Sequence, residues 1–82
     1  MREPYASKEM LDRQRERLIG KRIRLVFTND EYTDLRAGDE GTVTFIDDTG
    51  TVFADWDNGS GLGLIEQYGD RFEVLTESVA RG

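Results

Sequence analysis

Apolar and polar residues alternate in short runs after Gly20, and turn residues separate these runs. The clearest runs are Thr42–Ile46 and Thr51–Trp56, which are rich in the β-branched and aromatic residues that favour strands. Asp47–Gly50 lies between them, and an Asp-Asn-Gly sequence at residues 57–59 follows the second run. Asn-Gly is a strong hairpin signal because both central residues of the favoured turn adopt a positive φ. The pattern predicts two antiparallel strands bounded by tight turns.

Three further strands are expected in the same part of the chain. Lys21–Phe27 alternates apolar and basic residues, Leu62–Ile65 follows a Gly-Ser-Gly sequence, and Phe72–Leu75 comes last. A long polar loop, Thr28–Ala37, follows the first strand, and Glu66–Asp70 fits a single helical turn. The expected core consists of the inward-facing apolar residues, with one of two neighbours in the second strand: Ile23, Leu25, Val43, Phe45 or Ile46, Val52, Ala54, Trp56, Leu62, Leu64, Phe72 and Val74.

A short helix is expected before the strands. Ser7 is a suitable N-cap for a helix over residues 8–18. The negative charges of Glu9 and Asp12 stabilise this helix because they lie near the positive end of its dipole. The apolar edge of this helix is too thin to stabilise it alone: Met10, Leu11, Leu18 and Ile19. Two roles stay open. The helix either packs on the strands or frays as a solvated segment, or it binds a partner through its basic side chains.

Five short strands, a long first loop and a helical turn before the last strand are typical of a small SH3-like barrel. The expected fold is therefore all-β: a five-stranded SH3-like barrel preceded by one short N-terminal α-helix. We expect an N-terminal extension over residues 1–19, the barrel over residues 20–76 and a loose tail over residues 77–82. At 82 residues the chain has room for one domain.

Composition excludes several kinds of site. The chain contains no cysteine and no histidine, which removes disulfides, thiolate metal sites and the commonest general base. No apolar run approaches the ~20 residues that span a bilayer, and the first residues do not form a signal-peptide core. We therefore expect a soluble, cytoplasmic protein with no cofactor and no membrane partner. Because so small a barrel rarely contains a catalytic cleft, we do not expect an enzyme.

Charge is distributed unevenly along the chain. Residues 1–24 contain eight basic and four acidic side chains, whereas residues 25–82 contain three basic and thirteen acidic ones. So acidic a barrel repels a phosphate backbone, which disfavours nucleic-acid binding through its body. One alternative is an accessory factor that contacts phosphate through a basic N-terminal arm, formed by Arg13, Arg15, Arg17, Lys21, Arg22 and Arg24. Another is an acidic mimic of nucleic acid that blocks a DNA-binding protein.

The long polar loop supplies the main candidate for a protein-binding surface. It contains a tyrosine among acidic residues, and nothing in its pattern requires that this tyrosine be buried. A second tyrosine lies in the predicted helical turn before the last strand. Aromatic grooves of this kind bind peptides in SH3-like barrels. The candidate surface is a groove rimmed by carboxylates and consists of Tyr32, Tyr68, Asp30, Glu31 and Asp34.

Three other patterns favour structure over chemistry. Four carboxylates lie within eleven residues but at opposite ends of one strand: Asp47, Asp48, Asp55 and Asp57. One ion cannot easily collect them, and turn capping accounts for aspartate at such positions, so we expect no metal site. Gly59–Gly63 precedes a strand, whereas a phosphate cradle requires a helix there. Trp56 alternates with Val52 and Ala54, which places its ring in the core.

Several segments form a recognisable set: Gly20–Leu25, Gly38–Val43, Ile46–Gly50, Trp56–Gly59, Leu62–Leu64 and Asp70–Phe72. Together they resemble a family of short domains of unknown function that occurs in bacteria, archaea, phages and other mobile elements. The resemblance implies a phage or mobile-element accessory or virion-associated protein, in the host cytoplasm or the virion, but brings no established activity. The rhythm of turn glycines is more distantly similar to KOW and mind-bomb-type SH3-like barrels, which bind nucleic acid or peptides. We therefore expect a non-catalytic protein-interaction module whose protein partner is unidentified.

Overall fold

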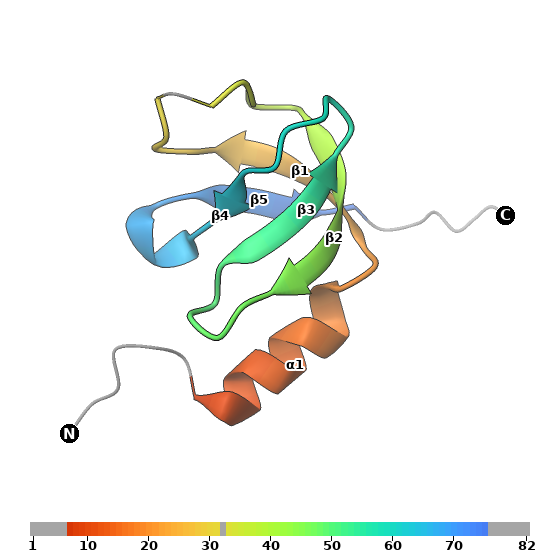
Figure 1. The fold of residues 1–82 in the computed structure, drawn as a ribbon, viewed down its shortest axis with the longest axis vertical. Coiled ribbons are helices and arrows are strands. Elements are labelled where there is room, and N and C mark those ends of the chain that lie inside the picture. The colour runs from red at the N-terminus through yellow and green to blue at the C-terminus, as the bar shows by residue number, and fades with distance from the viewer. Residues whose placement is uncertain (1–6, 32, 76–82) are drawn as a thin grey trace, which may run out of the picture.

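The computed structural model describes residues 7–31 and 33–75 of the 82-residue chain. These residues form one α-helix, one 3₁₀ turn and five strands (Figure 1). In chain order the elements are α1 (Lys8–Leu18), β1 (Arg22–Phe27), β2 (Glu40–Ile46), β3 (Val52–Trp56), β4 (Gly63–Leu64), η1 (Glu66–Tyr68) and β5 (Arg71–Val74). All of them overlap the segments that the sequence predicts. The predicted tail, residues 77–82, lies outside the described residues.

The described strands form one antiparallel sheet in the order β4-β3-β2-β1-β5. β1 lies between β2 and the last strand, β5, with Ile23 opposite Val74 and Leu25 opposite Phe72. No ladder joins β4 to β5 in the part of the chain that the structure describes, so the hydrogen-bonded sheet is open. The mostly β architecture is confirmed, whereas the expected barrel is not closed by continuous strand pairing.

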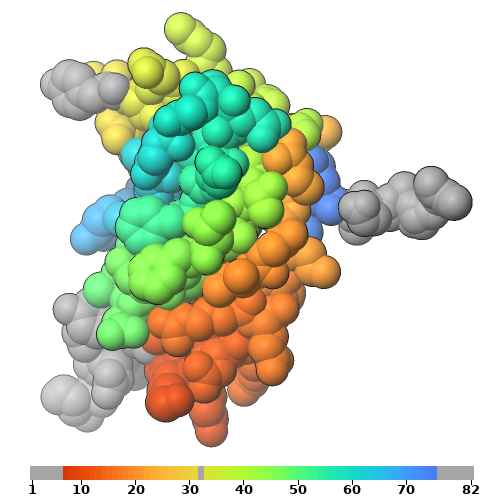
Figure 2. All heavy atoms as spheres, turned by 45° about the vertical axis from the view of Figure 1, so that its right-hand side comes forward, coloured from red at the N-terminus to blue at the C-terminus, as the bar shows by residue number. Residues whose placement is uncertain are grey.

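α1 packs against the sheet and contributes to its core. The side-chain oxygen of Ser7 accepts a hydrogen bond from the backbone nitrogen of Met10 at 3.2 Å, which confirms the predicted N-cap. Leu11 and Leu18 are buried, with exposed fractions of 6% and 0%, in the same cluster as the sheet residues. In the space-filling view, α1 and β1 (red and orange) lie alongside β2 (green) (Figure 2). The helix is therefore part of the fold, and of the two outcomes expected for a helix with a structural role it packs on the strands and does not fray.

The buried apolar cluster matches most of the predicted core. Its members are Leu11, Leu18, Ile23, Leu25, Leu35, Val43, Ile46, Val52, Ala54, Trp56 and Leu64, with Leu62 and Phe72 partly buried against it. Of the two candidates in β2, Ile46 is buried and Phe45 is 55% exposed. The prediction for Val74 is wrong, because this residue lies at the end of an edge strand and is 36% exposed. Leu35 joins the core from the loop before β2 and is not predicted by the strand pattern.

Two irregularities in strand pairing decide which residues leave the core. The register between β2 and β3 shifts between Val43 and Phe45, so that the next inward residue is Ile46. Phe45 instead stacks on Phe53, with the ring centroids 5.9 Å apart. The register between β1 and β5 also shifts just before Phe27, which is 51% exposed although it alternates with buried residues in the sequence. Bulges therefore override simple alternation at both places.

Trp56 lies in the core, as predicted, with 2% of its surface exposed. Its indole Nε1 donates a hydrogen bond to the backbone oxygen of Leu62 at 2.9 Å, which satisfies its one polar group. Gly41 lies directly against it: a Cβ atom there would be 2.9 Å from both Asp55 O and Trp56 Cα. The close approach of β2 and β3 at this point therefore requires a glycine.

Candidate functional site

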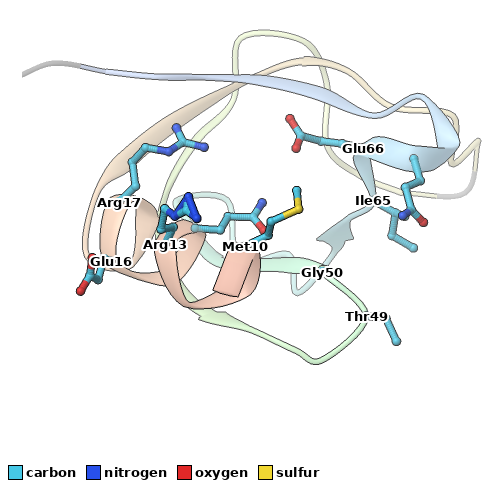
Figure 3. Close-up of a pocket in the computed structure, with 10 residues that line it drawn as sticks. Met10, Arg13, Glu16, Arg17, Thr49, Gly50, Ile65 and Glu66 are labelled. Carbon is cyan, nitrogen blue, oxygen red and sulfur yellow. The ribbon is translucent and has the colours of Figure 1, made fainter. Parts of the chain in front are cut away.

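A groove of about 610 Å³ lies between α1, the turn that joins β2 to β3, and η1 (Figure 3). Its lining residues are Met10, Arg13, Gln14, Glu16, Arg17, Thr49, Gly50, Ile65, Glu66 and Gln67. This volume is within the range of pockets that hold small ligands. The strand and turn patterns of the sequence do not predict such a groove, because it forms only when α1 docks beside η1.

α1 forms one wall of the groove. Four of the lining residues have the spacing of one helix face, on which neighbours are three or four positions apart. They are Met10, Arg13, Gln14 and Arg17. Figure 3 shows the labelled side chains of this set on the groove side of the helix. Met10 is 59% exposed, whereas Leu18, which packs on the sheet, is fully buried. The helix therefore presents one face to the core and another to the groove.

The opposite wall consists of η1 and the residue before it, Ile65, and Asp70 holds this wall in place. The Asp70 carboxylate accepts hydrogen bonds from Ile65 N at 2.8 Å, Asn29 N at 3.0 Å and Thr28 Oγ1 at 2.9 Å. Burial opposes ionisation of this group, which is 7% exposed, but the hydrogen bonds outweigh it and lower the pKa of Asp70. A single carboxylate thus links the wall to the end of β1.

The third side of the groove is the turn between β2 and β3, which is fixed by Asp47. One of its carboxylate oxygens accepts hydrogen bonds from Thr49 N, Thr49 Oγ1 and Thr51 N, at 3.0, 2.8 and 2.9 Å. Partial burial opposes ionisation, but these hydrogen bonds lower the pKa of Asp47. The predicted turn-capping role of this aspartate is confirmed.

Arg15, a member of the predicted basic arm, fastens α1 to the sheet. Its Nε donates to the backbone oxygen of Ile46 at 3.1 Å, and its Nη2 lies 3.3 Å from Asp48 Oδ1. A third contact joins Arg15 Nη1 to Asp12 Oδ1 at 3.6 Å. These contacts orient the helix and with it the wall of the groove.

Two more members of the arm belong to an ion-pair network across the sheet. Arg22 Nη2 lies 2.6 Å from Asp57 Oδ2 and 3.3 Å from Glu40 Oε1, and Arg24 contacts Glu40 at 3.5 Å and Glu73 at 2.9 Å. The hydrogen bond to Asp57 raises the pKa of the Arg22 guanidinium, and the same bond lowers the pKa of the Asp57 carboxyl. The network joins β1 to β2, β5 and the end of β3.

The remaining members of the arm are exposed. Arg13, Arg17 and Lys21 form no ion pair with any residue in the described ranges 7–31 and 33–75. Only Arg13 and Arg17 line the groove. The fold thus places Arg22 and Arg24 in the sheet network, Arg15 at the helix anchor and Arg13 and Arg17 in the groove, and leaves Lys21 exposed outside it. The basic arm as a phosphate surface stays a prediction.

None of the described residues of the predicted tyrosine surface is among the residues that line the groove. Tyr68 ends η1 and is 70% exposed, and its backbone oxygen accepts a hydrogen bond from the Asn29 side chain. Glu31 and Asp34 are exposed in the loop between β1 and β2, at the end of the molecule opposite α1 (Figure 1). Asp30 is also exposed, and Tyr32 lies outside the described residues. This surface stays a prediction.

The described residues contain no group of three or more His, Cys, Asp or Glu side chains placed to hold a metal ion. The four carboxylates that the sequence brings close together are separated: Asp47 caps a turn, whereas Asp48 and Asp57 pair with arginines. No helix among residues 7–31 and 33–75 is long and apolar enough to cross a membrane.

One known family matches residues 7–75: the domain of unknown function DUF4314. The chain belongs to this family. The match confirms the resemblance that the turn and strand residues indicate, and it also includes α1, which forms a wall of the groove. No curated protein and no solved structure matches the chain. Membership of the family therefore leaves the function to be inferred from the groove.

Sequence reasoning identifies part of the groove and misses the rest. Arg13 and Arg17 were candidate residues, and Met10 precedes them by three and seven positions, which is a helix-face signal visible in the sequence. Ile65 and Gln67 carry no such signal, because their place beside α1 depends on how η1 folds back. The groove is thus a tertiary feature, and only its α1 wall can be predicted from the sequence.

Proposed function

We propose that this chain is a non-catalytic protein-interaction module that binds a segment of a partner protein in the groove between α1 and η1. The groove itself carries the proposal. It is open and has both apolar and polar walls, and its walls are held by buried leucines on one side and by Asp70 on the other. A preformed groove lowers the entropic cost of binding a flexible segment.

The residues of the groove support binding rather than catalysis. The sequence has no histidine or cysteine to act as base or nucleophile. Apart from two glutamates, the lining consists of arginine, glutamine, threonine, glycine, methionine and isoleucine. Such side chains offer charge, amide hydrogen bonds and apolar contact, which are what a peptide ligand requires.

The arrangement of the strands supports an SH3-like architecture for this module. Consecutive strands β1 to β4 are neighbours in the sheet, and β5 returns to pair with β1. A short helical turn, η1, leads into β5 as it does in the expected barrel. In this interpretation β4 and β5 approach each other at the open side of the sheet without sharing a ladder. Small barrels of this type are frequent peptide-binding modules.

Phosphate binding by α1 is the alternative function, because exposed basic residues lie on this helix and just after it. Arg13, Arg17 and Lys21 are exposed on or just after one helix and lack ion pairs among the described residues. Three cations are few for a nucleic-acid surface, and the net charge of the chain is −6. We therefore propose that the partner is a protein and that the two meet in the cytoplasm. If a phage or mobile element encodes the chain, the partner is a virion component or a host factor.

Site-specific photo-crosslinking tests the proposal. A photoreactive phenylalanine analogue replaces Gln14 in the groove, Tyr68 in the tyrosine surface or Asp55 on the sheet, each in the full chain. Each variant is irradiated in a lysate of the source cells with and without an excess of unlabelled wild-type chain. We expect a protein adduct at position 14 that the wild-type chain suppresses, and none at position 55.

Each other outcome is informative. An adduct at position 68 alone moves the binding site to the tyrosine surface. An adduct at position 14 that nuclease digestion removes identifies nucleic acid and rejects the proposal. Equal adducts at positions 14 and 55 indicate non-specific contact and also reject it.

A further inference from the structure

The helix α1 carries three arginines, and the fold uses only one of them. Arg15 contacts Ile46, Asp48 and Asp12, as described above. Arg13 and Arg17 have no ion-pair partner in the described part of the chain, yet both line the groove. Two cations therefore line a ligand space, and neither forms an ion pair with a carboxylate of the described residues, although Glu16 and Glu66 also line the groove.

The spacing of these two arginines adds to the argument. Residues four positions apart on a helix are neighbours, and two like charges in that relation destabilise the helix by about 0.2–0.5 kcal/mol. An anion that contacts both guanidinium groups removes this repulsion. Planar guanidinium groups bind carboxylates with paired hydrogen bonds, so a carboxylate suits the pair well.

An apolar surface adjoins the cations within the same groove. Met10 lies three residues before Arg13 on the same side of α1 and is 59% exposed. Ile65 is half-buried on the opposite wall, where Asp70 fixes its backbone. An apolar side chain of a ligand can contact both while a neighbouring carboxylate reaches the arginines.

Glu66 disfavours a continuous polyanion more strongly than a ligand that brings one carboxylate. In Figure 3 its carboxylate extends from the η1 wall toward the helix, and Arg17 extends from the opposite wall. A continuous polyanion such as a nucleic-acid backbone would place phosphates near this carboxylate and be repelled. A peptide avoids this repulsion because it carries its charges on separate side chains.

Resting on the proposed function, we propose that the groove binds an acidic peptide segment in which an aspartate or glutamate lies close to an apolar residue. Arg13 and Arg17 bind the carboxylate, and Met10 and Ile65 contact the apolar side chain. Gln14 lines the groove from the same helix as Arg13 and Arg17, and its amide can donate to or accept from the peptide backbone.

Selection from a phage-displayed library of random twelve-residue peptides tests this inference on the full chain. The selected peptides are then synthesised, and their affinity is measured by fluorescence anisotropy. We expect acidic residues next to leucine, isoleucine, valine or methionine to be enriched. Replacing the acidic residues of a selected peptide by their amides should weaken its binding about tenfold.

Two matched double variants distinguish the contribution of the groove arginines to affinity from the effect of the net charge of the chain. Arg13→Gln/Arg17→Gln should weaken binding of a selected peptide about tenfold. When this variant is used in the library selection, acidic peptides should no longer be enriched. Lys21→Gln/Arg36→Gln changes the net charge by the same amount at two exposed residues outside the groove and should leave affinity within twofold.

The outcomes distinguish this inference from the proposed function. Peptides that lack acidic residues but compete with the position-14 crosslink overturn the inference and leave the proposed function standing. Equal weakening by both double variants also overturns the inference, because it reflects net charge alone. Failure to select any peptide, together with binding of a twelve-base-pair DNA duplex that requires Arg13 and Arg17, overturns both.

Discussion

The two faces of α1 contain similar side chains but differ in what the fold does with them. One face places Leu11 and Leu18 in the core and fastens Arg15 to the β2–β3 turn. The other exposes Met10 and aligns along a groove two arginines that form no ion pair with any described residue. The difference shows that a basic helix on an acidic domain is not uniformly a binding element. The contacts of each residue decide whether it stabilises the fold or is available to a ligand.

The largest expected effect comes from removing the core face of this helix. Leu18→Ala should lower the free energy of unfolding by about 2–5 kcal/mol, because the leucine is fully buried and leaves a cavity. Met10→Ala on the groove face should change it by less than about 0.5 kcal/mol. Urea denaturation followed by tryptophan fluorescence measures both. Similar losses for the two variants would contradict the division of the helix into two faces.

The next effect concerns the wall opposite the helix. Asp70→Ala should destabilise the fold by about 1–3 kcal/mol, because it leaves three partly buried donors, at Ile65, Asn29 and Thr28, without this acceptor. Crosslinking at position 14 should weaken in this variant as the wall loosens. Hydrogen exchange at the Ile65 amide is the direct measurement, and unchanged protection there would show that Asp70 does not hold the wall.

The same carboxylate predicts a pH dependence with a definite sign. The pKa of Asp70 is lower in the folded chain than in the unfolded chain, so its ionised form stabilises the fold above about pH 4. This contribution is lost as the pH falls further, through the folded pKa. Asp70→Asn should therefore flatten the decline in stability below pH 4. Part of the decline should persist, because Asp47 and Asp57 also have lowered pKa values.

A smaller effect is expected from the arginine that anchors the helix. Arg15→Ala removes a hydrogen bond to the backbone and two ion pairs, and should cost about 0.5–1.5 kcal/mol. Arg17→Ala, one half-turn further along the same helix, is the matched control and should be nearly neutral. Thermal unfolding of the two variants side by side tests the comparison, and a larger loss for Arg17→Ala would reverse it.

The smallest effect on stability, and the largest on binding, is expected for the groove arginines together. Arg13→Gln/Arg17→Gln should leave the free energy of unfolding within about 0.5 kcal/mol of wild type, or raise it slightly, because a like-charge pair is removed. A clear loss of stability would mean that these arginines belong to the fold after all. Binding data for this variant could then not be interpreted as loss of a ligand contact.

Local signals in the sequence predict the elements of this fold well. The N-cap at Ser7, the aspartate that begins the β2–β3 turn and the alternation around Trp56 each act within a few residues, and each is confirmed. At Phe45 and Val74, such local signals do not predict whether the side chain is buried. A register shift turns Phe45 outward, and the edge position exposes Val74, so neither outcome depends on the residue's own neighbours in sequence.

The candidate site depends more strongly on tertiary structure. The sequence offers six basic residues as one arm, but ion pairs with residues up to 49 positions away remove Arg15, Arg22 and Arg24 from it. Of the three that remain, Lys21 lies outside the groove, and Arg13 and Arg17 line it one turn apart. The significance of this pair appears only when η1 lies opposite. The acidic tyrosine surface lies partly outside the described residues and stays a prediction.

The pairing of β5 with β1 has a consequence for synthesis on the ribosome. β1 is made before the other strands described, yet one of its edges is completed only by residues 71–74, which are made about fifty residues later. Until that segment leaves the exit tunnel, the nascent chain exposes an unpaired strand edge and the apolar side chains beside it, which favours association with chaperones or with other nascent chains. Translation arrest before Arg71 should therefore yield a chain that a protease digests readily, whereas arrest well beyond the described residues should yield a resistant one.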